Sequence, residues 1–136
     1  MSTEYGTMKH TFISVEWFDA YIERVNNDPE LAAIGRWFNA SWFLIADQTR
    51  KVIKVEAGKI TEVVHAPRID TRAVFGFRAP VATWEKFISK KPPPLHNDFF
   101  AMLMRVPEFT IEGESLVAMQ NARALQRMMN LMREGV

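Results

Sequence analysis

The chain has 136 residues, of which 48% are apolar and 24% charged, and its formal net charge is +1, a balance typical of a single globular domain. Lys and Arg are scattered along the chain, so the charge pattern argues against a nucleic-acid partner and against an anionic membrane surface. The chain contains no cysteine, which excludes disulfide bonds and thiolate metal sites.

The chain lacks the sequence features of a protein that crosses a membrane. No run of about 18 apolar residues is available to span a bilayer, so we expect no stable membrane insertion. Glu16, Asp19, Glu23 and Arg24 interrupt every apolar core that a signal peptide would need. We therefore expect a cytoplasmic protein whose residues 1–136 form one domain, with a flexible segment at residues 1–11.

The first half of the chain predicts two helices followed by four strands. Ser14 is suited to cap a helix that runs to about Asn26, because the apolar residues after it recur at helical spacing. Asp28, followed by a proline, starts a second helix to about Phe38, although Gly35 weakens it. Short runs of strand-forming residues then predict four strands, with a glycine turn between the second and the third, at residues 41–46, 50–55, 59–65 and 69–77.

The second half predicts two shorter helices, a strand and a long closing helix. A proline starts the helix at residues 81–89, and three consecutive prolines then break the chain. Residues 99–104 ("FFAMLM") follow as a short helix without a polar side chain. A helix that is apolar on every side must be covered on every side, by protein or by a ligand. The fifth strand is predicted at 108–112 and the closing helix at 115–133.

The predicted closing helix has an unusually wide apolar face. At 100° per residue, one half of its circumference is apolar except for one amide side chain, whereas an ordinary surface helix needs a stripe of about 100°. The residues of this half are Val117, Ala118, Asn121, Ala122, Ala124, Leu125, Met128, Met129, Leu131 and Met132. Such a face can meet a sheet on one side and a second apolar surface on the other. Plain core is the favoured interpretation of the methionines, and an adaptable binding surface is the alternative.

Two polar features could contact a ligand. Asn121 is the polar side chain within the apolar half, and a hydrogen bond to a neighbouring backbone group is its favoured interpretation. The alternative is a handle for the polar end of a ligand. For Lys90 and Lys91 a solvated loop is favoured, with ligand contact as the alternative.

The sequence has no recognisable catalytic or cofactor-binding motif. Glycine-rich nucleotide loops, the zinc-protease helix and the serine-hydrolase elbow are all absent. His10, His65 and His96 are far apart in the sequence. We therefore predict no metal site, no cofactor and no enzymatic activity.

Three stretches occur in an order and spacing that resemble the sterol carrier protein type 2 family of lipid-binding domains. They are "DPELAAIGRWFNASWFLIAD" (28–47), "VATWEKFISKKPPPLHNDFFAMLMR" (81–105) and "EFTIEGESLVAMQNARALQRMMNLM" (108–132). The resemblance implies an α+β fold in which a five-stranded, mostly antiparallel sheet is covered by about five helices and encloses an apolar cavity. It also implies non-catalytic binding or carriage of a fatty acid, fatty acyl-CoA, sterol or similar lipid.

The apolar segments and the resemblance together predict the residues that contact the lipid. These candidates are Trp84, Phe99, Phe100, Met102, Leu103, Phe109, Asn121, Leu125, Met128 and Met132. The alternative function is an interaction module that assists an enzyme or forms a homodimer, in which protein rather than lipid covers the apolar face.

Overall fold

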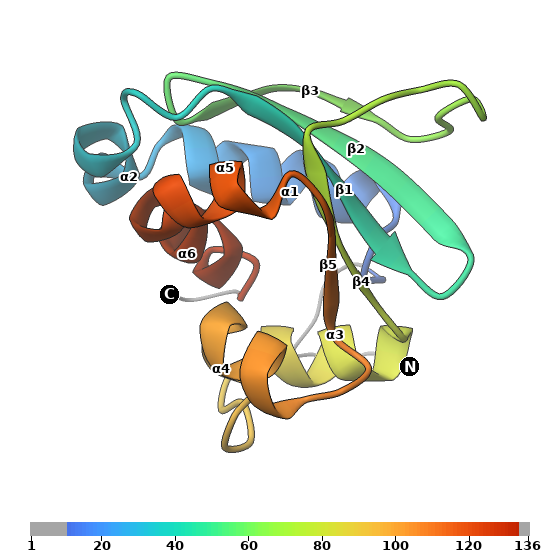
Figure 1. Ribbon diagram of the computed structural model, residues 1–136. Helices are drawn as coiled ribbons and strands as arrows, with labels where there is room; N and C mark the ends of the chain where they lie inside the picture. The colour runs from blue at the N-terminus through green and yellow to red at the C-terminus, as the bar shows by residue number, and fades with distance from the viewer. Residues whose placement is uncertain (1–10, 134–136) are drawn as a thin grey trace.

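A computed structural model describes residues 11–133 of the chain (Figure 1). We expected a flexible segment at residues 1–11. Residues 1–10 of that segment lie outside the described residues. The elements follow one another in the order α1 (Val15–Asn26), α2 (Pro29–Ile34), β1 (Ala40–Ala46), β2 (Thr49–Glu56), β3 (Lys59–Val64), β4 (Phe75–Ala79), α3 (Val81–Ile88), α4 (Phe99–Arg105), β5 (Thr110–Gly113), α5 (Ser115–Gln120) and α6 (Ala122–Asn130).

The strands form one mixed sheet in the order β3-β2-β1-β4-β5. β1 pairs in parallel with β4, whereas the β1–β2, β2–β3 and β4–β5 pairs are antiparallel. Figure 1 shows the helices gathered on one side of the curved sheet. The predicted α+β architecture with a mostly antiparallel five-stranded sheet is therefore confirmed.

The two predicted helix caps in the first half of the chain are confirmed. The Ser14 hydroxyl accepts a hydrogen bond from the Trp17 amide at 3.1 Å, and an Asp28 carboxylate oxygen accepts one from the Leu31 amide at 2.8 Å. Both bonds satisfy amides of the first turn that have no partner within the helix. α2 ends at Ile34, short of the predicted end near Phe38.

A close approach between two glycines explains where α2 ends. The turn between β2 and β3 passes so near the end of α2 that a Cβ atom at Gly58 would lie 2.7 Å from the carbonyl oxygen of Gly35. Gly58 also has a φ of +76°, a conformation that other residues adopt only at a cost. The Gly58 amide donates to the Phe38 carbonyl oxygen at 3.0 Å, which fixes the turn against the chain that leads into β1.

The prediction of a strand at residues 69–77 was wrong for residues 69–74. β4 begins at Phe75, and the chain before it forms a turn in which the Arg68 amide donates to the Thr71 hydroxyl at 2.9 Å. This side-chain bond gives the backbone an alternative to strand pairing. Ile69 is almost fully exposed, so the apolar residues there do not mark a buried face.

The prediction of one continuous closing helix was also wrong, because the helix breaks at Asn121. The Asn121 backbone has φ −112° and ψ 24°, and it separates α5 from α6. Its side-chain amide donates to the Val117 carbonyl oxygen at 2.9 Å, as an asparagine that competes with the helix ladder does. The break raises the number of helices among residues 11–133 to six, against about five expected.

The hydrophobic core lies between the sheet and the helices. Trp42 and Leu44 of β1 stand beside Phe75 and Phe77 of β4 in the parallel register, and all four side chains are buried. Because side chains alternate along a strand, these residues form one apolar face. All six described helices contribute buried residues to the same core cluster, α2 through Leu31.

Candidate functional site

The inner face of the sheet carries a cluster of aromatic rings around Phe77. The ring centroid of Phe77 lies 5.5 Å from Phe99, 5.5 Å from Phe109, 5.8 Å from Phe75 and 5.9 Å from Trp42. These spacings are those of favourable aromatic pairs. The cluster therefore joins the central strand β1, the strand β4 and the short helix α4.

Trp84 of α3 extends the cluster toward the end of the sheet. Its ring lies 5.4 Å from Phe109, and its indole N–H donates to the Ile45 carbonyl oxygen at 3.0 Å. The indole N–H of Trp42, by contrast, has no hydrogen-bond partner among the described residues although it is buried.

The methionine face of α6 closes the core on the other side. Leu125, Met128 and Met132 have no exposed surface and belong to the same cluster as the aromatic rings. The Tyr21 hydroxyl donates to the Met128 carbonyl oxygen at 2.7 Å, and burial raises the pKa of Tyr21 well above its usual range. Arg24 donates to the Leu131 carbonyl oxygen at 2.8 Å, so α1 holds the end of α6 in place.

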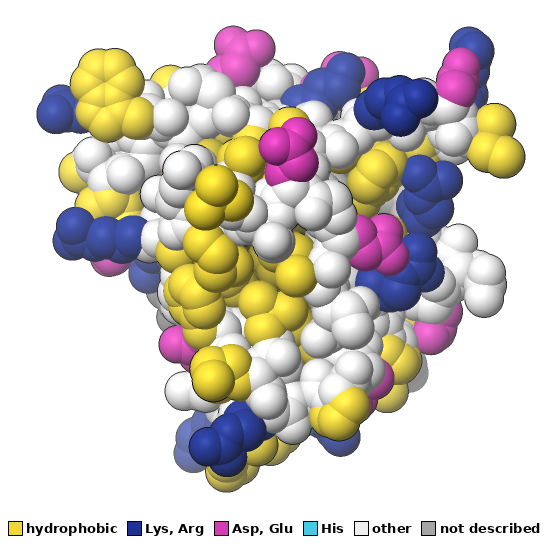
Figure 2. Space-filling model, in the orientation of Figure 1, with side chains coloured by type: hydrophobic (Ala, Val, Ile, Leu, Met, Phe, Trp, Pro, Cys, Tyr) yellow, Lys and Arg dark blue, Asp and Glu magenta, His cyan; other side chains and the backbone are white. Residues whose placement is uncertain are grey.

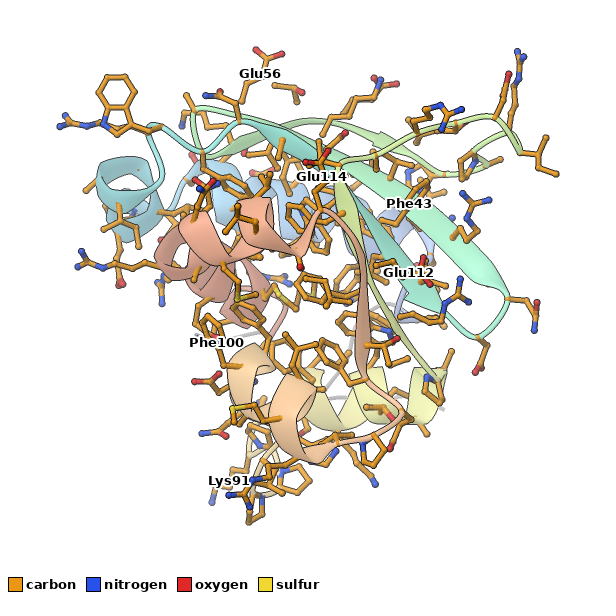
Figure 3. All side chains as sticks on the ribbon, viewed as in Figure 1. Phe43, Glu56, Lys91, Phe100, Glu112 and Glu114 are labelled. Carbon is orange, nitrogen blue, oxygen red and sulfur yellow. The ribbon has the colours of Figure 1, made fainter. Side chains whose placement is uncertain are left out.

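A chain of ring contacts, here called the aromatic path, connects this interior to the surface. Phe100 is 38% exposed, and in Figure 3 it projects from α4 toward α6. Its ring stacks on Phe99 with centroids 4.5 Å apart. Phe99 then contacts Phe77, and Phe77 contacts Trp42. The aromatic path consists of these four residues.

The outer end of the aromatic path opens into a groove of about 480 Å³, a size typical of small-molecule sites. α2, α6 and the beginning of α4 form its walls. Its lining residues are Glu30, Ile34, Asp98, Phe100, Ala122, Arg123, Gln126, Arg127 and Asn130.

Most polar groups of the groove are engaged within the protein. The Arg127 guanidinium donates to the Asp28 carboxylate at 2.7 and 3.0 Å, and this bond holds the pKa of Asp28 below its usual range. Asp98 caps α4 by accepting from the Phe100 amide at 2.7 Å. The Gln126 side chain donates to Asn130 at 2.9 Å.

Apolar side chains also gather on the neighbouring surface between α5–α6 and α4, as Figure 2 shows. The partly buried apolar residues of α4, β5, α5 and α6 are Leu103, Ile111, Val117, Met119 and Ala122. Phe100, Leu116 and Met104 are more exposed. This surface is therefore more apolar than the groove, whose lining includes several charged and amide side chains.

The predicted site residues fall into two groups. One group is buried in a single core cluster and consists of Trp84, Phe99, Met102, Phe109, Leu125, Met128 and Met132. Leu103 and Asn121 are half-buried and Phe100 is exposed. The favoured interpretation of Asn121, a bond to a neighbouring backbone group, is confirmed. Lys91 lies on the loop before α4, away from α6 (Figure 3).

Sequence reasoning missed the groove. Arg123 and Gln126 lie on the half of the closing helix opposite the apolar one, and Ile34 lies on a different helix. α2 and α6 are far apart in the sequence, so no local pattern indicated that they meet. Arg127 paired with Asp28 holds them together in the structure.

The described residues show neither a metal centre nor a membrane span. No group of three or more His, Asp or Glu side chains within residues 11–133 could hold a metal ion. No helix in that part of the chain is both long and apolar enough to cross a bilayer.

Comparisons with known proteins agree on the fold. No protein-family model and no curated protein matches the chain. A crystal structure of sterol carrier protein 2 matches with a TM-score of 0.73 at 18% identity, over 91% of this chain and 98% of that one. A UbiJ-SCP2 ubiquinone synthesis protein matches with a TM-score of 0.57 at 12% identity, over 85% and 90%.

A solution structure of sterol carrier protein domain 2 from Helicoverpa armigera has a TM-score of 0.53 at 17% identity, over 89% of this chain and 91% of that one. At these identities a likeness establishes the fold, and function has to be argued from the site. The resemblance that the sequence indicated is thus confirmed at the level of structure: the chain has the sterol carrier protein 2 fold.

Proposed function

We propose that the protein binds and carries a hydrophobic small molecule, such as a fatty acid, fatty acyl-CoA, sterol or similar lipid, without transforming it. The observation that carries this proposal is the aromatic path, which leads from Phe100 in the groove to Trp42 at the centre of the sheet. The names of the solved structures that share the fold support it, since two of them are sterol carriers.

The side chains of the interior, among them Phe99, Met102 and Met128, have no exposed surface, so a lipid that reaches them has to separate α4 from α6. α4 has only seven residues and lies between three prolines and Pro107. The contacts that hold its beginning to α6 include the Phe99 amide donating to Gln126 at 3.3 Å and a weak bond from Arg133 to the His96 carbonyl oxygen at 3.4 Å. These two long hydrogen bonds contribute little to holding α4 in place, so the barrier to opening is mainly the exposure of Phe99 and Met102, which are fully buried.

Burial of the lipid chain supplies the free energy of binding. Each buried methylene contributes about 0.8 kcal/mol, so ten contribute about 8 kcal/mol before the costs of ordering the ligand are subtracted. Micromolar affinity requires about 8 kcal/mol net. A chain of 16 to 18 carbons, roughly what common lipids carry, therefore has enough apolar surface to bind at micromolar concentration.

Displacement of a fluorescent fatty acid by unlabelled oleate and cholesterol tests the proposal. We expect Phe100→Ala to weaken binding several-fold, because Phe100 lines the groove and stacks on Phe99. Met104→Ala is the matched control, since Met104 lies on the same helix but is 80% exposed and does not line the groove. If neither lipid binds below about 100 μM, where the net binding energy is about 5.5 kcal/mol, lipid carriage is ruled out.

An accessory role remains the second candidate. The match to a UbiJ-SCP2 ubiquinone synthesis protein and the exposed Leu116 and Met104 favour an apolar surface that another protein, or a second copy of the chain, covers. Native mass spectrometry of freshly purified protein distinguishes the two roles. Lipid that co-purifies with the monomer supports carriage, whereas a lipid-free dimer supports the accessory role.

A further inference from the structure

We infer that Trp42 is the hydrogen-bond donor for a neutral oxygen atom of the bound molecule, so that the preferred ligands are long-chain lipids with a hydroxyl or carbonyl oxygen. This inference rests on the lipid-binding function proposed above. It goes further because it names the atom that recognises the ligand and the chemistry of the ligand's buried end.

The first step is the missing partner of the Trp42 indole. The side chain is 0% exposed, and its N–H has no acceptor among the described residues. Buried N–H groups in proteins nearly always have a partner, and one without a partner costs about 1–3 kcal/mol. The indole N–H of Trp84, which is equally buried, does have such a partner, because it donates to the Ile45 carbonyl oxygen. Trp17 also lacks a partner, but its ring contacts are with Phe12, Phe18 and Tyr21 and not with a residue of the aromatic path.

The second step is the position of Trp42 at the inner end of the aromatic path. β1 is the central strand of the sheet, and the Trp42 ring lies 5.9 Å from Phe77 and 6.3 Å from Phe75. A ligand that enters beside Phe100 and follows the ring contacts inward therefore ends beside Trp42. Such a ligand would bring its leading end next to the Trp42 ring, whose N–H has no acceptor among the described residues.

The third step concerns the charge of that oxygen. Among the described residues, Arg133, at 7% exposed, is the one buried charged side chain, and it donates to the Phe87 carbonyl oxygen at 2.6 Å. Lys51, on the inner face of β2, donates to the His65 carbonyl oxygen at 3.1 Å. Trp42 stands between Ile53 of β2 and Phe75 of β4, which are uncharged, so a carboxylate beside it would have no adjacent counterion, and burying an unpaired charge is costly. A hydroxyl or carbonyl oxygen can accept the bond without that cost.

Three probes with the same chain length test the inference: oleyl alcohol, methyl oleate and 1-octadecene, which carries no oxygen. Their affinities are measured on the full chain by displacement of a fluorescent fatty acid. We expect the wild type to prefer the alcohol and the ester over the alkene by about tenfold, the factor that one net hydrogen bond of about 1.4 kcal/mol supplies. Trp42→Phe should reduce this preference to about twofold while leaving the alkene affinity unchanged. Trp37→Phe, at an exposed position, should change nothing.

A second measurement keeps the inference testable if Trp42→Phe does not fold. In ¹⁵N-labelled wild-type protein, oleyl alcohol should move one buried indole N–H resonance downfield, and 1-octadecene should leave it in place. An unchanged resonance, or an equal preference in the wild type and Trp42→Phe, would overturn the role of Trp42 while lipid binding stands. Failure of the fluorescent fatty acid and of all three probes to bind would overturn the proposed function itself.

Discussion

Replacing Trp42 and Trp84 one at a time by phenylalanine compares two buried indoles that differ in one hydrogen bond. Both side chains are 0% exposed, so the two substitutions remove the same atoms from a packed environment. Trp84→Phe also breaks the bond from the indole N–H to the Ile45 carbonyl oxygen. Trp42→Phe removes an N–H that has no acceptor among the described residues.

The difference between the two variants follows from these contacts. In Trp84→Phe, the lost hydrogen bond lowers the free energy of unfolding by about 0.5–1.5 kcal/mol. In Trp42→Phe, the buried N–H without a partner, which costs about 1–3 kcal/mol, is removed, so part of that free energy is regained. We therefore expect the free energy of unfolding of Trp84→Phe to be about 2 kcal/mol lower than that of Trp42→Phe. Urea denaturation followed by far-ultraviolet circular dichroism measures the difference. The protein has to be delipidated first, because a ligand that binds the folded state raises its apparent stability.

The reasoning fails if Trp42→Phe loses as much stability as Trp84→Phe. That result would show that the Trp42 N–H already has a partner in the lipid-free protein, such as a buried water. Comparing the same pair after loading with oleyl alcohol adds a control. The difference between the variants should then shrink, because the ligand oxygen gives the wild-type Trp42 a bond that Trp42→Phe cannot make.

Further substitutions test the core, a turn and an ion pair. Met128→Ala should lower the free energy of unfolding of the lipid-free protein by about 2–5 kcal/mol, because Met128 has no exposed surface; a loss below about 1 kcal/mol would instead indicate empty space beside it. Gly58→Ala should lower the melting temperature through a strain of about 1–3 kcal/mol, since its φ is +76°, and an unchanged melt would contradict the observed turn. The bond from Arg127 lowers the pKa of Asp28, so its stabilisation is complete above the ordinary value of 3.8 and is lost as the pH falls through the lower folded pKa. Acid denaturation curves should show this loss in the wild type and not in Asp28→Asn.

The elements that the sequence predicted well are those with a local physical cause. Ser14 and Asp28 accept the hydrogen bonds that their positions before a helix indicated. The apolar segment at 99–104 forms the expected short helix, and its Phe99 and Met102 are fully buried. In each case the signal lies within a few residues of the feature, so a single sequence contains it. The expectation that the short helix is covered on every side was wrong, because Phe100 and Met104 are exposed.

The errors occur where a side chain competes with regular structure. Asn121 interrupts the closing helix by binding the Val117 carbonyl oxygen, although the helical period of apolar residues continues across it. Arg133, placed on the polar half of that helix, is buried because it donates to the Phe87 carbonyl oxygen and covers the Phe87 ring at 4.4 Å. The spacing of apolar residues indicates which side chains can face the core. It does not indicate which backbone carbonyl oxygen a polar side chain such as Asn121 or Arg133 will bind.

The candidate site divides in the same way. The sequence identified the apolar residues of the interior, because burial follows from the width of the apolar face of α5 and α6. It gave no indication that Trp42 would lack a hydrogen-bond acceptor, because that depends on every neighbour of one atom. It also missed the groove, whose walls meet through the pair of Arg127 and Asp28.

Burial of the lipid chain and the unpartnered N–H of Trp42 together determine how such a carrier would discriminate between lipids. Chain burial contributes about 0.8 kcal/mol per methylene whatever the identity of the polar end, so affinity follows chain length and discriminates weakly between lipids of similar length. One hydrogen bond to Trp42 contributes less in total than two methylenes do. The bond can form only when the oxygen reaches the inner end of the aromatic path, so it selects the orientation of the ligand. A lipid held with its oxygen at the sheet and its tail toward Phe100 would leave tail first when α4 opens.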